Sequence, residues 1–144
     1  FYASNFSLGV NVFFAVNQYL AKIMNHFNAY DVDVHEVHHT QKLDAPSGTA
    51  ITIAQQIVKN ISRKKGYELD ATAKDMLKIT AERIDPAPGT HHVKYSSTID
   101  DIEIIHTAHN RLGFATGAVL AAEWMQNKTG SFSMEDMLKL NDLK

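Results

Sequence analysis

The stretch DVDVHEVHHTQKLDAPSGTA, residues 31–50, has the pattern of a strand, a loop and the start of a helix. Its first eight residues alternate polar and apolar side chains, with β-branched valines on one face, which predicts a β-strand. The alternation slips at Glu36-Val37, which indicates a bulge or a strand with both faces occupied. The proline and glycine that follow predict a loop, after which Ser47 caps a helix over about residues 49–63.

Apolar spacing predicts further elements on either side of this stretch. A long amphipathic helix is expected before it, over about residues 8–27, because apolar side chains recur there at helical spacing. Residues 64–73 are polar and poorly periodic, which indicates a surface loop. The remaining pattern predicts strands over residues 77–84, 91–97 and 102–108, then helices over residues 113–125 and 134–140.

The order of these elements, α-β-α-β-β-β-α-α, is typical of the α+β class. We expect a mixed four-stranded sheet with helices packed on one face. The last three strands have short connections, so we expect them to pair as antiparallel neighbours. A chain of 144 residues is long enough for one compact domain with its own core.

The composition argues against several classes of function. The chain is 44% hydrophobic and 21% charged, with a formal net charge of −2, as is ordinary for a globular protein. Lysine and arginine do not cluster on one face, so we expect no nucleic-acid partner. No apolar stretch is long enough to span a membrane. Cysteine is absent, which excludes disulfides and thiolate zinc sites and favours a reducing, cytoplasmic location.

Three nitrogen bases lie together at the end of the first predicted strand: His38, His39 and Lys42. On a strand, His38 and His39 point to opposite faces, so they are expected to have different roles. Lys42 follows the strand and can turn back toward either histidine. A histidine can move protons near neutral pH.

The predicted helix start at Ser47-Gly48-Thr49 offers a second set of polar groups. Free backbone N–H groups and the positive end of the helix dipole make such a start a site for anions. Gly48 allows close approach to the backbone, and Thr49 adds a hydroxyl. Together with the basic residues, this start predicts a site for a small dicarboxylate. Asp44 is expected either to orient Lys42 or a histidine, or to form an Asx-turn.

Other interpretations of these residues remain open. The basic residues are also typical of a partly exposed strand end, and the helix start is also typical of a simple cap. Metal-ligand types are supplied by His35, Glu36, His38 and His39. Their spacing on a strand does not bring them together without a bulge, so no metal site is predicted. We expect His91 and His92 to be surface or turn residues.

Residues 36–50 contain every fixed position of the pattern E-x-H-H-x-x-K-x-D-A-P-S-G-T-A. This stretch closely resembles the signature of the dihydrodipicolinate reductase family, also called 4-hydroxy-tetrahydrodipicolinate reductase. The resemblance covers essentially the whole chain and implies the C-terminal substrate-binding domain of such an enzyme. Further similar segments are Ala3-Ser4-Asn5-Phe6-Ser7, Glu82-Arg83, residues 88–91, residues 106–111 and residues 114–119.

The resemblance implies a role for each residue of the pattern. His38 corresponds to the residue that the family uses as proton donor or acceptor. His39 corresponds to the histidine that binds one substrate carboxylate. Lys42 corresponds to a proton donor that also contacts substrate. Gly48 and Thr49 correspond to the pair that binds the other carboxylate.

The implied reaction is hydride transfer from NADPH or NADH to a cyclic dicarboxylate after loss of water, giving tetrahydrodipicolinate in lysine and diaminopimelate biosynthesis. In the family, an N-terminal Rossmann domain binds most of the cofactor, and no glycine-rich fingerprint of such a domain opens this chain. The short segment that corresponds to a nicotinamide contact consists of Ala3, Ser4, Asn5 and Phe6. We therefore expect this chain, taken alone, to lack reductase activity.

The chain begins at Phe1 without an initiator methionine, and we interpret it as part of a longer protein. Residues 1–144 are expected to form the substrate-binding and oligomerisation domain. Within it, the helices of residues 112–144 are expected to pack against the N-terminal domain. The resemblance also implies a homotetramer, and it suggests that Arg111 senses domain closure or contacts substrate. Two alternative functions are a non-enzymatic oligomerisation module and a metal-dependent hydrolase.

Overall fold

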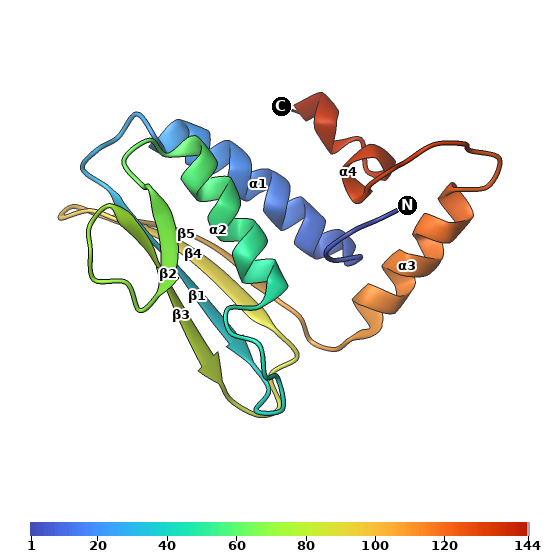
Figure 1. Cartoon of the computed structure of the whole chain (residues 1–144), viewed down its shortest axis with the longest axis horizontal. Coiled ribbons are helices and arrows are strands. Elements are labelled where there is room, and N and C mark those ends of the chain that lie inside the picture. Colours follow the sequence, from blue (N-terminus) through green and yellow to red (C-terminus); the bar gives the residue numbers. More distant parts are fainter. Residues whose placement is uncertain (144) are drawn as a thin grey trace.

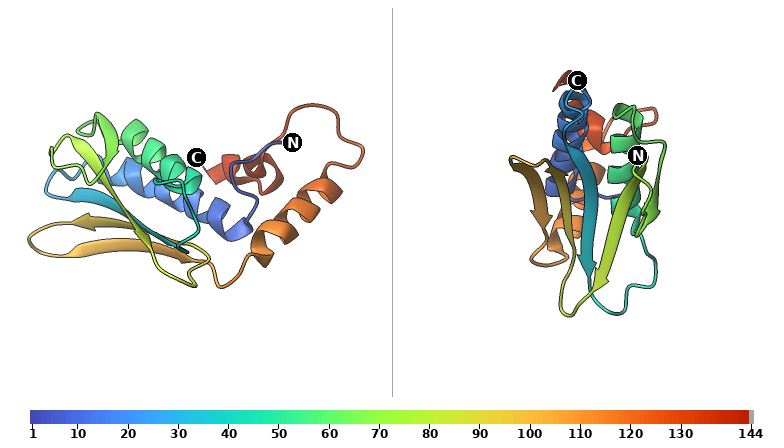
Figure 2. Two further views of the ribbon diagram at one scale, coloured as in Figure 1. Left: turned by 60° about the horizontal axis from the view of Figure 1, so that its bottom comes forward. Right: turned by 90° about the vertical axis from the view of Figure 1, so that its left-hand side faces the viewer.

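Residues 1–143 are described by the computed structural model, which contains one five-stranded mixed sheet with two long helices on one face (Figure 1). The elements are α1 Leu8–Met24, β1 Asp31–His38, α2 Gly48–Asn60, β2 Gly66–Leu69, β3 Met76–Arg83, β4 Thr90–Ser96, β5 Asp101–Thr107, α3 Leu112–Trp124, α4 Met134–Met137 and the 3₁₀-helix η1 Leu140–Leu143. Figure 2 shows α1 and α2 on the same side of the sheet. The predicted α+β class is confirmed.

The strand order is β2-β3-β1-β4-β5, which places β1 in the middle of the sheet. β1 pairs in parallel with β3 and antiparallel with β4. The prediction that the last three strands are antiparallel neighbours is therefore wrong for β3, although β4 and β5 do pair in that way. The physical reason is the crossover through α2, which returns the chain in the direction of β1 and makes β3 its parallel partner.

The sheet has five strands, one more than the sequence predicts, because residues 66–69 form β2. β2 is an edge strand that pairs in parallel with β3, within the segment predicted to be a surface loop. Its four residues, GYEL, are partly or fully exposed. A strand this short and this exposed shows no apolar alternation, so the sequence pattern could not reveal it.

β1 contains no bulge, which excludes the first of the two interpretations of the slip at Glu36-Val37. Its register against β3 and β4 is continuous. Burial alternates along the whole strand, so that Val32, Val34, Glu36 and His38 share the face covered by the helices. The alternation of polar and apolar residues breaks down in the sequence because Glu36 and His38 occupy buried positions that usually carry apolar side chains.

The hydrophobic core lies between that face of the sheet and the two long helices. Ser47 caps α2, as predicted, and Ser7 caps α1; each hydroxyl accepts a hydrogen bond from a backbone N–H in the first turn. Asn17 of α1 is fully buried and donates to the Ile53 carbonyl of α2, which joins the helices. The largest fully buried apolar side chains of this core are Tyr95, Ile53, Ile57, Ile61, Leu77, Ile79, Val34 and Val93. Burial of each such side chain stabilises the fold by about 1.5–3 kcal/mol.

The helix α3 extends away from the sheet (Figure 2). Only Gly117 and Ala121 are buried in α3. The N-terminal segment crosses α3 at Gly117, where an added Cβ atom would lie 1.8 Å from the Phe6 carbonyl oxygen. Ser133 and Asp136 form a capping box at the start of α4. Among the residues that the structure describes, no helix combines the length and apolar character needed to cross a membrane.

Candidate functional site

The predicted site residues meet at one end of the sheet. β1 and β3 are parallel and end side by side, with His38 opposite Arg83 in the register. β4 runs the other way and begins at the same end, so that His91 pairs with Glu36. The loop after β1 then leads to Ser47 and the start of α2. The crossover therefore brings two strand ends, one strand start and one helix N-terminus together.

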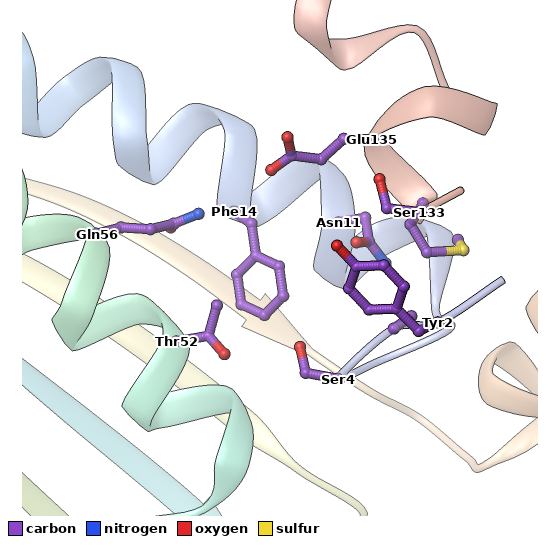
Figure 3. Close-up of a pocket in the computed structure, with 10 residues that line it drawn as sticks. Tyr2, Ser4, Asn11, Phe14, Thr52, Gln56, Ser133 and Glu135 are labelled. Atoms are coloured by element: carbon purple, nitrogen blue, oxygen red, sulfur yellow. The ribbon is translucent and has the colours of Figure 1, made fainter. Parts of the chain in front are cut away.

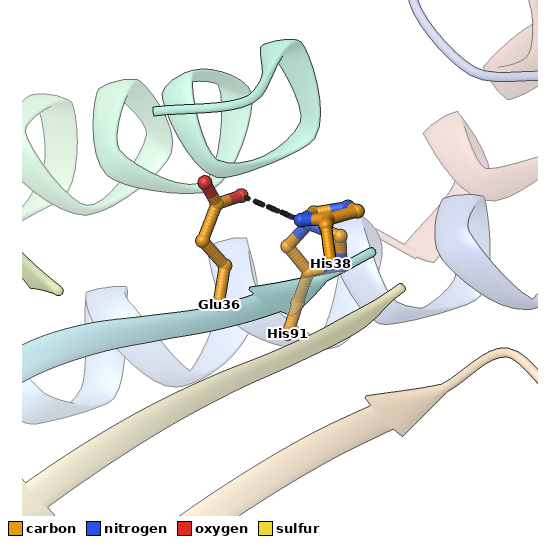
Figure 4. Close-up of side chains that lie close together, drawn as sticks. All are labelled: Glu36, His38 and His91. Atoms are coloured by element: carbon orange, nitrogen blue, oxygen red, sulfur yellow. Dashed lines mark ion pairs between the residues drawn. The ribbon is translucent and has the colours of Figure 1, made fainter. Parts of the chain in front are cut away.

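Five residues form what we call the inner cluster: Glu36, His38, Ser47, Arg83 and His91. At its centre the Glu36 carboxylate is fully buried. Its Oε1 atom accepts a hydrogen bond of 3.0 Å from the Ser47 backbone N–H and one of 3.3 Å from Arg83 Nη2. Its Oε2 atom accepts from the Ser47 hydroxyl. Two histidine nitrogens lie nearby, His38 Nδ1 at 3.4 Å and His91 Nε2 at 3.6 Å from Oε2 (Figure 4).

Glu36 is ionised at neutral pH despite its burial. Burial alone would raise the pKa of this carboxyl group. Hydrogen bonds from His91 and Ser47 and the nearby His38 outweigh burial and lower the pKa to about 2. Arg83 supplies the positive charge that a buried carboxylate needs.

Arg83 also holds the loop that follows β1. Its Nε atom donates to the Lys42 carbonyl at 3.1 Å, and Nη2 donates to the Asp44 carbonyl at 2.5 Å. One guanidinium group thus joins the inner cluster to the backbone that carries Lys42. In the sequence, Arg83 belongs to a segment that resembles the family, and no role was predicted for it. No local pattern could have predicted these contacts, because the partners lie about forty residues away in the chain.

His38 is 7% exposed and lies on the covered face of β1. Burial is the main cause that lowers the pKa of its imidazole to about 4, although the Glu36 charge opposes this shift. The ring is therefore neutral at pH 7 and can accept a proton. A Cβ atom added at Gly89 would lie 3.1 Å from His38 Nε2, and the φ of +155° at Gly89 favours glycine. Gly89 thus leaves space beside Nε2.

His91 is buried, which corrects the prediction of a surface or turn residue. Its ring packs edge-on against His38 with centroids 5.1 Å apart. Its Nε2 atom lies 3.3 Å from the Ser47 hydroxyl oxygen. The pairing of β4 with β1 brings His91 into the cluster, and this long-range pairing was not predicted.

Four residues form what we call the outer rim: His39, Lys42, Asp44 and Arg111. His39 follows the last residue of β1 and accepts a hydrogen bond of 2.8 Å at Nε2 from Arg111 Nη2. Both side chains line an open pocket of about 250 Å³ together with Gln41, Asp85, Pro86, Pro88 and Asn110. His38 and His39 therefore have different surroundings, as their opposite directions on a strand predict.

Lys42 and Asp44 form an exposed ion pair on the rim, with Lys42 Nζ donating to Asp44 Oδ1 at 2.9 Å. This contact matches the first of the two roles predicted for Asp44. It also holds the pKa of the Asp44 carboxyl below its usual value. The Lys42 ammonium group is thus held at the loop surface by Asp44.

The start of α2 has the features of an anion site. As the first two helical residues, Gly48 and Thr49 have N–H groups without an intrahelical acceptor. An added Cβ atom at Gly48 would have no neighbour within 4 Å, so the approach to the backbone is open. The Thr49 hydroxyl accepts a hydrogen bond of 3.2 Å from Asn5 Nδ2. Asn5 belongs to the predicted nicotinamide contact, so this segment reaches the predicted carboxylate site.

Ala3 and Ser4 of the same segment line a second pocket of about 260 Å³ between α1, α2 and α4 (Figure 3). This volume is below the ~300–1,000 Å³ typical of pockets for small molecules. The nicotinamide contact that the resemblance implies for Ala3, Ser4, Asn5 and Phe6 therefore stays a prediction. Phe6 lies further along the segment, where it crosses α3.

Glu36, His38 and His91 are also ligand types for a metal ion, and one ligand atom of each lies within 4.8 Å of the others. The expectation that the spacing keeps such residues apart is therefore wrong for this group. Alternate positions of β1 share a face, and β4 supplies the third residue. Both Glu36 oxygens already accept hydrogen bonds from Ser47 and Arg83. We therefore interpret the group as a hydrogen-bonding network.

The fold places basic side chains beside an open helix N-terminus, an arrangement whose chemistry suits a small anion. The family model described as "Dihydrodipicolinate reductase, C-terminus" matches residues 9–138. The chain belongs to this family, which confirms the resemblance found in the sequence.

A curated relative and a solved structure agree with this assignment. The chain is 58% identical over 137 residues to 4-hydroxy-tetrahydrodipicolinate reductase of Christiangramia forsetii, an alignment that covers 95% of the chain and 57% of the relative. The chain thus spans little more than half the length of that relative. The fold is similar to that of a dipicolinate-bound dihydrodipicolinate reductase from Paenisporosarcina sp. TG-14, with a TM-score of 0.66 and 24% identity, over 92% of this chain and 52% of that one.

Proposed function

We propose that this chain is the substrate-binding and catalytic part of a 4-hydroxy-tetrahydrodipicolinate reductase, an NAD(P)H-dependent enzyme of lysine and diaminopimelate biosynthesis. One observation carries the proposal: His38, His39 and Lys42 lie at the same end of the sheet as the open N-terminus of α2. The 58% identity to a relative of that name supports it.

In this proposal two sets of donors hold the two substrate carboxylates. The N–H groups of Gly48 and Thr49, with the Thr49 hydroxyl, bind one carboxylate at the positive end of α2. His39 and Lys42 bind the other from the rim. Two fixed anchors orient a small rigid dicarboxylate, so the reacting double bond is held in one position.

The reaction also requires proton transfer, which the basic residues supply. When bound, NADPH or NADH delivers hydride to the substrate, and a proton must be added with it. Lys42 carries protons in its ammonium group and can donate one after release from Asp44. His38 is neutral at pH 7, because burial lowers its pKa to about 4. A neutral imidazole has a free nitrogen lone pair, through which it can accept or relay a proton. We assign Lys42 as donor and His38 as acceptor or relay.

Titration with pyridine-2,6-dicarboxylate by calorimetry tests this proposal. The wild-type chain should bind the compound, and His39→Ala or Lys42→Ala should weaken binding by about tenfold or more, because each removes a charge-assisted hydrogen bond. His26→Ala and Lys22→Ala are matched controls, since both residues are exposed at the far end of α1. Binding that survives the two site changes would place the anion site elsewhere.

We also propose that a separate N-terminal domain holds most of the cofactor. The apolar side chains that α3 exposes, Leu112, Val119 and Leu120, support a contact between residues 112–144 and such a domain. The chain alone should therefore fail to oxidise NADH or NADPH in the presence of substrate. Measurable oxidation by the purified chain would contradict this.

For assembly, we propose the homotetramer that the resemblance implies, formed through the face of the sheet that α1 and α2 leave uncovered. In this proposal the domain both forms the tetramer and carries the substrate site, so oligomerisation is not its only function. Light scattering coupled to size-exclusion chromatography should give a mass near four times 16.1 kDa. A monomer at all accessible concentrations would contradict the assembly and leave the site assignment intact.

A further inference from the structure

The inner cluster contains a buried anion for which the proposed reaction gives no role. Glu36 is fully buried on a strand face where Val32 and Val34 are its neighbours. An apolar side chain would fit this pattern, and burial of a carboxylate is unfavourable unless donors surround it. The donors of Glu36 come from the start of α2 and the end of β3. This arrangement indicates a function in organising the site.

Glu36 fixes the start of α2 through Ser47. The Ser47 hydroxyl donates to Glu36 Oε2 and accepts from the Ala50 N–H at 3.2 Å, and the Ser47 N–H donates to Oε1. Both polar groups of the cap residue are therefore directed by one carboxylate. Because Gly48 and Thr49 follow immediately, the direction of their N–H groups depends on this anchor. Arg83 balances the negative charge, so that Glu36 does not repel an anion at the helix start.

The same carboxylate faces His38. Its Oε2 atom lies 3.4 Å from His38 Nδ1, a buried atom that has no hydrogen-bond partner of normal geometry. A nearby negative charge favours the tautomer that carries its proton on the facing nitrogen. The lone pair is then on Nε2, beside the space that Gly89 leaves open.

His91 faces Glu36 and Ser47 with Nε2, whereas His38 faces Glu36 with Nδ1. Nε2 lies 3.6 Å from Glu36 Oε2 and 3.3 Å from the Ser47 hydroxyl oxygen. That oxygen has donated its hydrogen to Glu36, so it can only accept from His91. His91 is therefore expected to carry its proton on Nε2. The two neighbouring histidines should have opposite tautomers.

We propose that Glu36 is a positioning residue that holds His38 with its proton on Nδ1, leaving Nε2 free to accept a proton, and that simultaneously orients the N–H groups at the start of α2. The consequence for ligand binding rests on the proposed function. The tautomer assignment does not, because it concerns the chain without ligand.

The test is the tautomer of His38 in the chain, measured from nitrogen chemical shifts and long-range couplings of the histidine rings at pH 7. In the wild type, His38 should carry its proton on Nδ1 and His91 on Nε2. In Glu36→Gln, the side-chain oxygen must still accept from Ser47 and Arg83, which directs the amide NH₂ toward His38 Nδ1. His38 should then change to the Nε2–H tautomer.

Affinity for pyridine-2,6-dicarboxylate provides a second readout. Glu36→Gln should weaken it by about tenfold, since a charged acceptor in the network becomes neutral. Ser47→Ala should also weaken binding but leave the His38 tautomer unchanged. Glu103→Gln is the matched control, because Glu103 lies near His92 at the surface and should affect neither readout.

Three results would overturn the proposal: a wild-type His38 with its proton on Nε2, a folded Glu36→Gln variant with an unchanged tautomer, or a tautomer change in Ser47→Ala. The wild-type result decides the assignment even if Glu36→Gln does not fold. A wild-type chain that shows the predicted tautomers and does not bind the dicarboxylate would contradict the proposed function alone.

Discussion

The inner cluster and the outer rim lie at the same end of the sheet but are built in different ways. In the inner cluster the central carboxylate is fully buried, and its donors come from α2 and β3. On the rim, Lys42 and Asp44 form a partly exposed ion pair. His39 and Arg111 are in contact at the edge of an open pocket. We infer that the interior fixes the geometry of the site, whereas the rim is the region that we propose binds the ligand. Changes in the two regions should therefore separate stability from affinity.

The largest effect is expected from Glu36→Leu. Removal of the carboxylate leaves Arg83 and the Ser47 hydroxyl without their buried partner. The free energy of unfolding should fall by about 3–5 kcal/mol, as for other broken buried ion pairs. Urea denaturation measures the change, with Glu103→Leu at the surface as control. A loss below about 1 kcal/mol would show that Glu36 does not organise the interior.

Acid should weaken the inner cluster, because the folded state keeps His38 neutral. In the unfolded chain His38 has a pKa of about 6.5, whereas in the folded state its pKa is about 4. The unfolded chain therefore binds a proton at His38 at a higher pH than the folded state does. Stability is therefore complete above pH 6.5 and is lost as the pH falls toward 4, by at most about 3 kcal/mol. Below pH 4.5, protonation of Glu36 in the unfolded state adds to the loss, because its folded pKa is about 2.

Urea denaturation of the wild type and of His38→Gln across this pH range measures the contribution of His38. The wild type should lose more stability than the variant between pH 6.5 and 4. Equal slopes would show that His38 is not held neutral by its surroundings.

Gly89→Ala should have a smaller effect on the inner cluster. The residue has a φ of +155°, and a Cβ atom would lie 3.1 Å from His38 Nε2. Backbone strain of this kind costs roughly 1–3 kcal/mol, and the His38 ring signals should shift. Gly48→Ala is the matched control for stability, since its Cβ would meet no atom within 4 Å. Equal stability of both variants would contradict the close approach at Gly89.

The smallest effect on stability is expected on the rim. Lys42→Ala removes a partly exposed ion pair, so the free energy of unfolding should change by no more than about 0.5 kcal/mol. Its affinity for pyridine-2,6-dicarboxylate should nevertheless fall by about tenfold or more. If Lys42→Ala lost stability and kept its affinity, Lys42 would stabilise the fold and would not bind the ligand, contrary to the role proposed for the rim.

The sequence predicted the rim better than the interior. His39, Lys42 and the start of α2 are consecutive features of one stretch, and local patterns revealed the strand end, the loop and the Ser47 cap. The inner cluster depends on Arg83 and His91, which reach Glu36 only through the pairing of β1 with β3 and β4. Glu36 itself was obscured because a buried charge breaks the polar and apolar alternation. β2 was missed because a short exposed edge strand has no such alternation.

The central claim, that the start of α2 and the rim bind a dicarboxylate together, is tested most directly by backbone amide chemical shifts during titration with pyridine-2,6-dicarboxylate. We expect a saturable titration with the largest shifts at Gly48 and Thr49, and a strong weakening of that titration in Lys42→Ala. Saturable shifts centred away from the start of α2, or no saturable shifts at all, would contradict it.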